Sequence, residues 1–245
     1  MICVVLAAGY ATRLYPLTEN FPKPLLKVGR KTILNWLLDD MDEFDEIDKI
    51  VVISNHKFFE HFKEWASIQS LKKPLIILDD GSMDNESRLG AVRDIQFAIS
   101  ELKLKDDLLI VAGDNVLDFS LKHFVKFVAE KRTSCVMCHE ENELKKQQKT
   151  AIITKDDNDK IMTYEEKPLV PKGNLAVPPF YAYLKEDVMR ITEALEQGCS
   201  ADAPGSFAAW LSKQTDVHAW TMIGKRYDIG DLSSYQRTQE IFKNQ

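Results

Sequence analysis

The sequence predicts an α/β fold with a doubly wound, mostly parallel sheet and an antiparallel extension. Over the first two thirds of the 245 residues, short apolar runs alternate with amphipathic helical patterns, which is typical of a parallel sheet covered on both faces. From Ser134 onward, strand-like runs follow one another directly, and this change favours antiparallel strands added to the sheet. An apolar content of 44% is enough to close a sizeable core.

The apolar runs locate the individual elements. The expected parallel strands are Ile2–Leu6, Ile50–Ser54, Pro74–Leu78 and Leu108–Ala112. Helical spacing of apolar residues predicts helices between them at Ile33–Glu43, Phe58–Ser67 and Leu89–Glu101. The expected antiparallel strands are Ser134–Glu140, Ala151–Lys155, Lys160–Glu165 and Ala176–Leu184. Helices at Asp187–Gln197 and Ser206–Lys213, a strand at Val217–Met222 and a last helix from Leu232 complete the chain. With no repeat or linker, we expect one domain over residues 1–245, with lobes at 1–133 and 134–245.

The charge distribution restricts the partners of the chain. A formal net charge of -6, spread along the sequence, disfavours nucleic acid and anionic membranes as partners. An anionic ligand must therefore be bound by a local basic cluster. The segment from residue 13 to residue 31 offers one, because a single acid, Glu19, stands there among Arg13, Lys23, Lys27, Arg30 and Lys31. Such a cluster attracts a triphosphate.

The cysteines and the first residues indicate a reduced, cytoplasmic protein. Cys135 and Cys138 form a C-x-x-C pair, but they fall in a strand-like run without a second ligand pair, so we expect no zinc site. Met1 leads directly into the first strand, and a hydrophobic stretch of about seven residues is too short for export or for crossing a bilayer.

The loop after the first strand carries the most specific motif. Ligands of open parallel sheets bind beyond the carboxyl ends of the strands. Here the small residues Ala7, Ala8 and Gly9 let the backbone approach a base or a phosphate closely, and free amides in such a turn bind anions. Arg13 and Lys23 bring two cations to the same loop.

The pattern A-A-G-x-x-T-R-L-x-P-x-T, followed by P-K-x-L, resembles the signature of sugar-phosphate nucleotidyltransferases, which include the glucose-1-phosphate thymidylyltransferase-like enzymes. The resemblance implies a Rossmann-like nucleotide-binding lobe at 1–133 and an acceptor lobe at 134–245. It places Leu6, Ala7, Ala8 and Gly9 in the nucleotide site. It also assigns Arg13 to the β and γ phosphates and Lys23 to charge on the α phosphate. The chain departs from many members at Ala11, where they carry glycine.

Two aspartates are expected to hold Mg²⁺. Asp114 follows the fourth strand in Gly113-Asp114-Asn115, where a carboxylate can hold the ion against phosphate oxygens. The segment Tyr227-Asp228-Ile229-Gly230 resembles the aromatic-x-D-x-G element of the family, whose aspartate supplies the second ligand. We therefore expect Asp114 and Asp228 to meet in space and share one ion.

The resemblance also implies an acceptor site. Tyr164-Glu165-Glu166-Lys167-Pro168 is similar to the E-E-K-P element, which assigns Glu166 to sugar hydroxyls and Lys167 to the acceptor phosphate. The family's next segment maps substrate contacts onto Asn174, Val177 and Tyr181, although Pro178 and Pro179 replace residues that are often glycine and reshape the pocket. Gly90 resembles a glycine beside the base, but a glycine at a helix start has an equally common packing explanation.

The expected reaction transfers a nucleoside monophosphate from a nucleoside triphosphate to a sugar 1-phosphate and releases pyrophosphate. Three alternatives remain: a cytidylyltransferase for phosphocholine or another alcohol phosphate, an inactive regulatory subunit that binds a nucleotide sugar, and a glycosyltransferase. The last should carry D-x-D, which Gly113-Asp114-Asn115 lacks. No hexapeptide rhythm follows residue 230, so we expect no fused acyltransferase domain. The base, the sugar and the oligomeric state stay open, and a homo-oligomer is compatible with the sequence.

Overall fold

The computed structural model describes residues 1–244 and divides into two compact units. The first unit comprises Ile2–Leu89, Ala112–Lys122 and the chain from Gly224 onward. The second unit comprises Gly90–Val111 and His123–Ile223, together with Met1. Each unit is therefore assembled from segments that are far apart in the sequence.

Parallel strands lie at the centre of the first unit. β1 (Ile2–Leu6), β4 (Lys49–Ser54) and β5 (Leu75–Asp79) pair in the order β1-β4-β5, and Val4 lies opposite Val51. Most residues of β1 and β4 are buried, which explains why their sequences are apolar without alternation. The parallel strands predicted from the sequence are confirmed in this unit.

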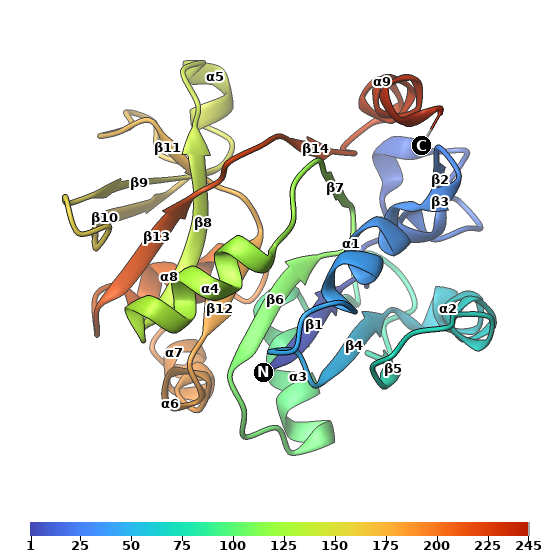
Figure 1. Cartoon of the computed structure of the whole chain (residues 1–245), viewed down its shortest axis with the longest axis horizontal. Coiled ribbons are helices and arrows are strands. Elements are labelled where there is room, and N and C mark those ends of the chain that lie inside the picture. Colours follow the sequence, from blue (N-terminus) through green and yellow to red (C-terminus); the bar gives the residue numbers. More distant parts are fainter. Residues whose placement is uncertain (245) are drawn as a thin grey trace. The chain divides into compact units, whose positions relative to one another are not determined.

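Helices of the first unit begin at identifiable caps. α1 (Ile33–Met41) starts after Thr32, whose side chain accepts a hydrogen bond from the backbone N–H of Asn35 at 3.1 Å. α2 (Phe59–Ser67) packs beside β5 (Figure 1). α9 (Leu232–Phe242) starts with a capping box at Asp231. The Phe242 ring of α9 meets Trp36 of α1 edge-on at 5.0 Å, so the last helix packs against the first.

The connecting segments of the first unit contain two short antiparallel strand pairs and three 3₁₀ turns. β7 (Asn115–Leu117) and β14 (Arg226–Asp228) form an antiparallel pair, visible side by side in Figure 1. β2 (Lys27–Val28) and β3 (Lys31–Thr32) form a second short pair. The 3₁₀ turns η1 (Thr12–Leu14), η2 (Lys23–Leu25) and η3 (His56–Phe58) follow β1 and β4.

The second unit contains the antiparallel extension. Its strands run in the order β10-β9-β11-β8-β12-β6, all antiparallel to their neighbours, and β13 joins β8 in parallel (Figure 1). The bounds are β6 (Leu108–Ala112), β8 (Ser134–Glu140), β9 (Ala151–Lys155), β10 (Ile161–Glu166), β11 (Leu175–Val177), β12 (Phe180–Tyr183) and β13 (Val217–Thr221). The predicted α/β class with an antiparallel extension is confirmed.

The helices of the second unit are mostly short. They are α3 (Ala91–Leu102), α4 (Lys122–Lys131), α5 (Leu144–Gln147), α6 (Lys185–Val188), α7 (Ile191–Glu196) and α8 (Gly205–Leu211). Within residues 1–244, every helix is too short or too polar to cross a membrane.

Two expected elements are wrong in detail. The single strand expected at Ala176–Leu184 is divided into β11 and β12, because Pro178 and Pro179 have no N–H to donate to a ladder. The helix expected at Asp187–Gln197 is two short helices, α6 and α7, separated by Met189 and Arg190. The sequence interpretation also missed α4, β7 and β14.

Candidate functional site

A cavity of about 290 Å³ opens at the loop after β1 in the first unit. It is lined by Leu6, Ala7, Gly9, Tyr10, Ala11, Thr12, Arg13, Lys23, Pro24, Asn85, Arg88, Ala112 and Asp114. The residues predicted to hold the nucleotide and its phosphates therefore gather around one space, with the exception of Ala8 and Gly90. Three of the lining residues carry a positive charge and one carries a negative charge, so the cavity suits an anion.

The loop after β1 is shaped by small residues. An added Cβ at Gly9 would meet no atom within 4 Å, so this residue leaves the cavity open. Ala11 adopts the left-handed conformation with φ 46°, in which an L-residue is strained by roughly 1 to 2 kcal/mol. The hydroxyl of Thr18 donates to the Ala11 carbonyl at 2.8 Å and helps hold this conformation. Alanine thus takes the backbone conformation that glycine would adopt more easily.

Ala8 and Gly90 have structural partners outside this cavity. Ala8 is buried, and its carbonyl oxygen accepts a hydrogen bond from the Asn55 side chain at 2.9 Å. Gly90 is the N-cap of α3 with φ 92°, and a Cβ there would lie 2.6 Å from the Ala201 carbonyl oxygen. Conformation and close packing therefore account for the glycine at position 90.

Lys23 connects two loops of the first unit. Its Nζ lies 2.5 Å from Asp114 Oδ2 and donates to the Ile229 carbonyl oxygen at 2.8 Å. The lysine side chain is only 11% exposed, whereas that of Asp114 is 33% exposed. The other carboxylate oxygen of Asp114 accepts a hydrogen bond from the Asn115 side chain at 2.7 Å. The ammonium group is therefore held in place and not left to sample solvent.

Asp114 is ionised in this setting. Burial raises the pKa of its carboxyl, but the charge and hydrogen bond of Lys23 lower it, and Arg226 adds a smaller effect of the same sign. The net result is a pKa below the ordinary value for aspartate. A carboxylate that stays charged while partly buried is available as a ligand for a cation.

Asp114 and Asp228 are brought close by the β7–β14 pair. In its register Asp228 lies opposite Asn115, the residue after Asp114, and the Ile229 N–H points to the Asp114 carbonyl oxygen at 3.4 Å. The Asp228 side chain is 53% exposed, with Arg226 Nη1 3.7 Å from its Oδ2.

These two carboxylates fit a magnesium ion. Mg²⁺ takes oxygen ligands, is often held by only one or two protein carboxylates, and leaves the remaining positions to water and phosphate. Residues 1–244 contain no group of three or more His, Cys, Asp and Glu side chains arranged for a metal. One Asp114 oxygen is already occupied by the Lys23 ammonium in this structure.

The expected acceptor residues line a cavity of about 310 Å³ in the second unit. Its lining consists of Lys149, Thr150, Ala151, Glu166, Lys167, Val177, Pro179, Tyr181, Asp202, Ala203, Pro204 and Gly205. Four of the five predicted acceptor residues are thus together. The fifth, Asn174, lies outside this lining, and its side chain donates to Asn142 at 3.3 Å.

Glu166 and Lys167 differ from ordinary surface residues. Burial raises the pKa of the Glu166 carboxyl, and the neighbouring Lys167 charge lowers it by less. Lys167 adopts the left-handed conformation with φ 48°, and its N–H donates to the Thr150 carbonyl oxygen at 3.1 Å. Glu166 is nevertheless exposed to solvent, so a strained backbone beside a carboxylate with a raised pKa makes this pair a candidate for a functional site.

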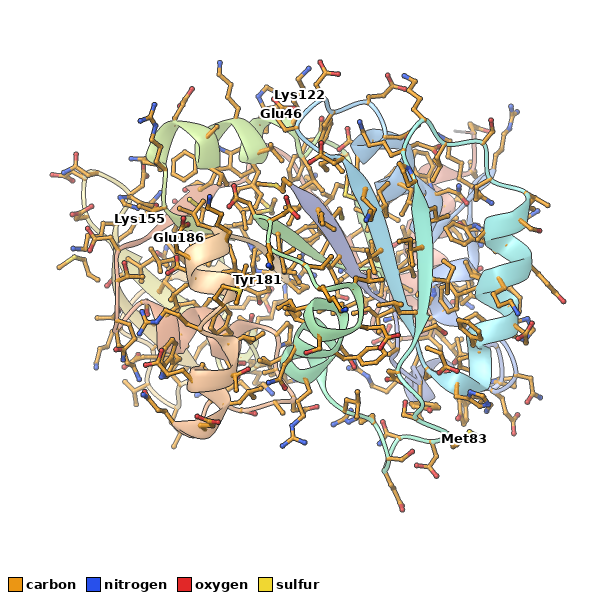
Figure 2. All side chains as sticks on the ribbon, turned by 90° about the horizontal axis from the view of Figure 1, so that it is seen from below. Glu46, Met83, Lys122, Lys155, Tyr181 and Glu186 are labelled. Carbon is orange, nitrogen blue, oxygen red and sulfur yellow. The ribbon has the colours of Figure 1, made fainter. Side chains whose placement is uncertain are left out.

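Several lining residues escaped sequence interpretation because no motif marks them. Asn85 and Arg88 lie on the exposed loop that carries Met83, which extends from its unit in Figure 2. The Asp84 carboxylate accepts hydrogen bonds from the N–H groups of Glu86 and Ser87 at 3.0 and 2.8 Å and folds this loop into a turn. The only signal in the sequence is its turn-forming composition.

Known proteins resemble this chain over its whole length. The model of the nucleotidyl transferase family matches residues 2–245. The bifunctional protein GlmU of Methanocaldococcus jannaschii is 28% identical over 251 residues, covering 96% of this chain and 54% of that protein. The UTP--glucose-1-phosphate uridylyltransferase AglF of Haloferax volcanii is 28% identical over 243 residues, covering 94% of this chain and 91% of that protein.

Solved structures extend the likeness to the fold. A UDP-glucose pyrophosphorylase in complex with UDP-glucose gives a TM-score of 0.83 at 18% identity, covering 98% of this chain and 97% of that one. Against GlmU, in contrast, the chain spans only about half of the relative's length.

Proposed function

Because the chain belongs to the nucleotidyl transferase family, we propose that it transfers a nucleoside monophosphate from a nucleoside triphosphate to a sugar 1-phosphate. The observation that carries this proposal is the cavity at the loop after β1, which is lined by Arg13 and by the ion pair of Lys23 with Asp114. Two cations suit a triphosphate, and a neighbouring carboxylate suits its metal ion.

The two cations have different tasks in this reaction. The planar guanidinium of Arg13 offers paired donors that match phosphate oxygens, so it binds the β and γ phosphates already in the ground state. The ammonium of Lys23 donates to the Ile229 carbonyl as well as to Asp114, so the Ile229 contact would keep the positive charge in place if a metal ion took over the Asp114 oxygen. Such a preorganised charge acts most strongly where charge develops, at the α phosphate.

Asp114 and Asp228 are the proposed holders of Mg²⁺. When bound there, the ion would neutralise phosphate oxygens and help align donor and acceptor. The protein's own contribution is to keep Asp114 ionised through Lys23 and Arg226, so that the carboxylate is ready for a cation without a proton to displace.

The cavity around Glu166 is the proposed acceptor site. Glu166 accepts hydrogen bonds from acceptor hydroxyls, and Lys167 with Lys149 offers positive charge to the acceptor phosphate. Tyr181 is the sole aromatic side chain among the lining residues, whereas a quaternary ammonium such as choline is usually recognised by several aromatic faces. This lining favours a sugar phosphate over phosphocholine.

The chemistry requires positioning and charge stabilisation. An oxygen of the acceptor phosphate forms a bond to the α phosphorus of the triphosphate, the bond from that phosphorus to the β phosphate oxygen breaks, and pyrophosphate leaves. No covalent enzyme intermediate is needed.

A pyrophosphate-release screen tests the proposal. Each common nucleoside triphosphate is combined with a panel of sugar 1-phosphates and alcohol phosphates that includes phosphocholine. We expect release with at least one sugar 1-phosphate and its loss in Lys23→Ala. Pyrophosphate release with phosphocholine alone would show that the acceptor is an alcohol phosphate and not a sugar phosphate. Binding of a nucleotide sugar without turnover of any pair would favour the regulatory subunit instead.

A further inference from the structure

Gly205 is the first residue of α8 and lines the acceptor cavity. A Cβ added at this position would lie 2.6 Å from Tyr164 Oη, 3.1 Å from Tyr181 Oη and 3.4 Å from Glu166 Oε2. Three oxygen atoms from two different strands therefore converge on the side of the helix where a side chain is missing. The contact with Tyr164 is too short for any residue other than glycine without a shift of the tyrosine or of the helix.

Backbone conformation does not explain the glycine. Gly205 lies within a helix and is not among the residues with positive φ. The close approach of the three oxygens is therefore the feature of this position that requires glycine.

Tyr164 is the residue that fills the space. Its ring is buried on β10, two residues before Glu166, and burial together with the neighbouring Tyr181, Tyr183 and Glu166 raises the pKa of its hydroxyl well above the ordinary value. Because α8 packs on β10, the tyrosine hydroxyl sets how closely the helix approaches the end of the strand that carries Glu166.

We propose that Gly205 is a positioning residue that determines acceptor specificity: by leaving room for Tyr164, it fixes the Glu166 carboxylate and the Tyr181 phenol side by side in the cavity. This inference rests on the proposed function. Tyr181, labelled in Figure 2, and Glu166 offer a donor and an acceptor of hydrogen bonds. A hydroxyl group, which both donates and accepts, matches that pair, whereas a quaternary ammonium has no proton to donate. The acceptor class is therefore a polyhydroxylated phosphate.

The test is a mutant cycle at positions 164 and 205. Gly205→Ala forces Tyr164 or α8 to move, so we expect the KM for the sugar phosphate to rise roughly ten- to a hundredfold, the range for a perturbed binding pocket. The KM for the triphosphate should stay within about twofold of wild type. Removing the obstructing oxygen in Tyr164→Phe/Gly205→Ala should recover most of the lost acceptor affinity. Ser206→Ala, on the same helix turn, is the matched control.

Two results would overturn the inference. One is an unchanged acceptor KM in Gly205→Ala, and the other is a double variant no better than Gly205→Ala. If Gly205→Ala does not fold, the folding of the double variant becomes the test. A folded double variant supports the inference, and an unfolded one shows that the obstruction is not the Tyr164 hydroxyl. Wild-type turnover is measured first, so failure of the proposed function appears there. The thermal unfolding midpoints of the four proteins in the cycle still report the coupling between Tyr164 and Gly205 without any substrate.

Discussion

Lys23 Nζ lies 2.5 Å from Asp114 Oδ2, although the two residues are 91 positions apart in the sequence. The contact joins the loop after β1 to the turn between β6 and β7. In the absence of ligands the two groups neutralise each other, so the cation proposed to act on phosphate and the carboxylate proposed to hold a metal ion form one ion pair. Under the proposed function, the triphosphate and its metal ion would each supply a new partner to one member of that pair.

Lys23→Ala should lower kcat roughly a hundred- to a thousandfold, the scale for removing one preorganised donor. The triphosphate KM should change much less, because the charge of Lys23 is most valuable as charge develops at the α phosphate. Steady-state kinetics with both substrates check this. A kcat within about threefold of wild type would contradict the role of Lys23.

Arg13→Ala should raise the triphosphate KM as well as lower kcat, since the guanidinium is assigned to phosphates that are bound before the reaction. Arg30→Ala is the matched control, because Arg30 is exposed, belongs to the same basic segment and does not line the cavity. Equal triphosphate KM values for the two variants would remove Arg13 from the phosphate site.

Features set by neighbouring residues could be predicted from the sequence, and contacts set by distant segments could not. The strands β8 and β9 have the predicted bounds because their apolar runs end at polar residues. The sequence interpretation followed the apolar pattern across Pro178 and expected a single strand. The strand is divided there because proline has no N–H to donate to a β-ladder. Arg88 lines its cavity through loop geometry and Gly205 through the packing of α8 on β10, and nothing near them in the sequence states which residues they meet.

Glu166→Gln should stabilise the protein near neutral pH while weakening acceptor binding. Burial raises the pKa of this carboxyl in the folded state. Stability is therefore lost as the pH rises from the ordinary glutamate pKa of about 4.3 through the higher folded value, and it stays lower above that window. Glutamine does not ionise, so the gain in unfolding temperature should be larger at about pH 7.5 than at about pH 4.

The neighbouring Glu165 provides the control for this prediction. Glu165 forms an ion pair with Lys172 at 2.8 Å, so Glu165→Gln should not gain stability at neutral pH. The acceptor KM should rise in Glu166→Gln and stay unchanged in Glu165→Gln. A Glu166→Gln protein that is both less stable at neutral pH and unaltered in acceptor KM would make Glu166 a scaffold residue.

Asp114 and Asp228 should bind one divalent ion together, and Lys23 should oppose that binding when no substrate is present. The β7–β14 register places Asp228 opposite the residue next to Asp114, and Lys23 occupies one Asp114 oxygen. Asp114→Asn and Asp228→Asn should each weaken Mn²⁺ binding, measured by electron paramagnetic resonance, and each should abolish most turnover. The double variant should be little worse, because the two carboxylates act as one unit.

Lys23→Ala distinguishes this arrangement from a general loss of function. Removing a positive charge beside Asp114 frees a carboxylate oxygen and lowers the repulsion that an entering cation meets. We therefore expect Lys23→Ala to bind Mn²⁺ more tightly than wild type in the absence of nucleotide, although its turnover falls. Lys27→Ala, an exposed lysine outside the cavity, should leave the affinity unchanged. Weaker Mn²⁺ binding in Lys23→Ala, or normal binding in Asp228→Asn, would mean that the metal does not bind at Asp114 and Asp228 in competition with Lys23.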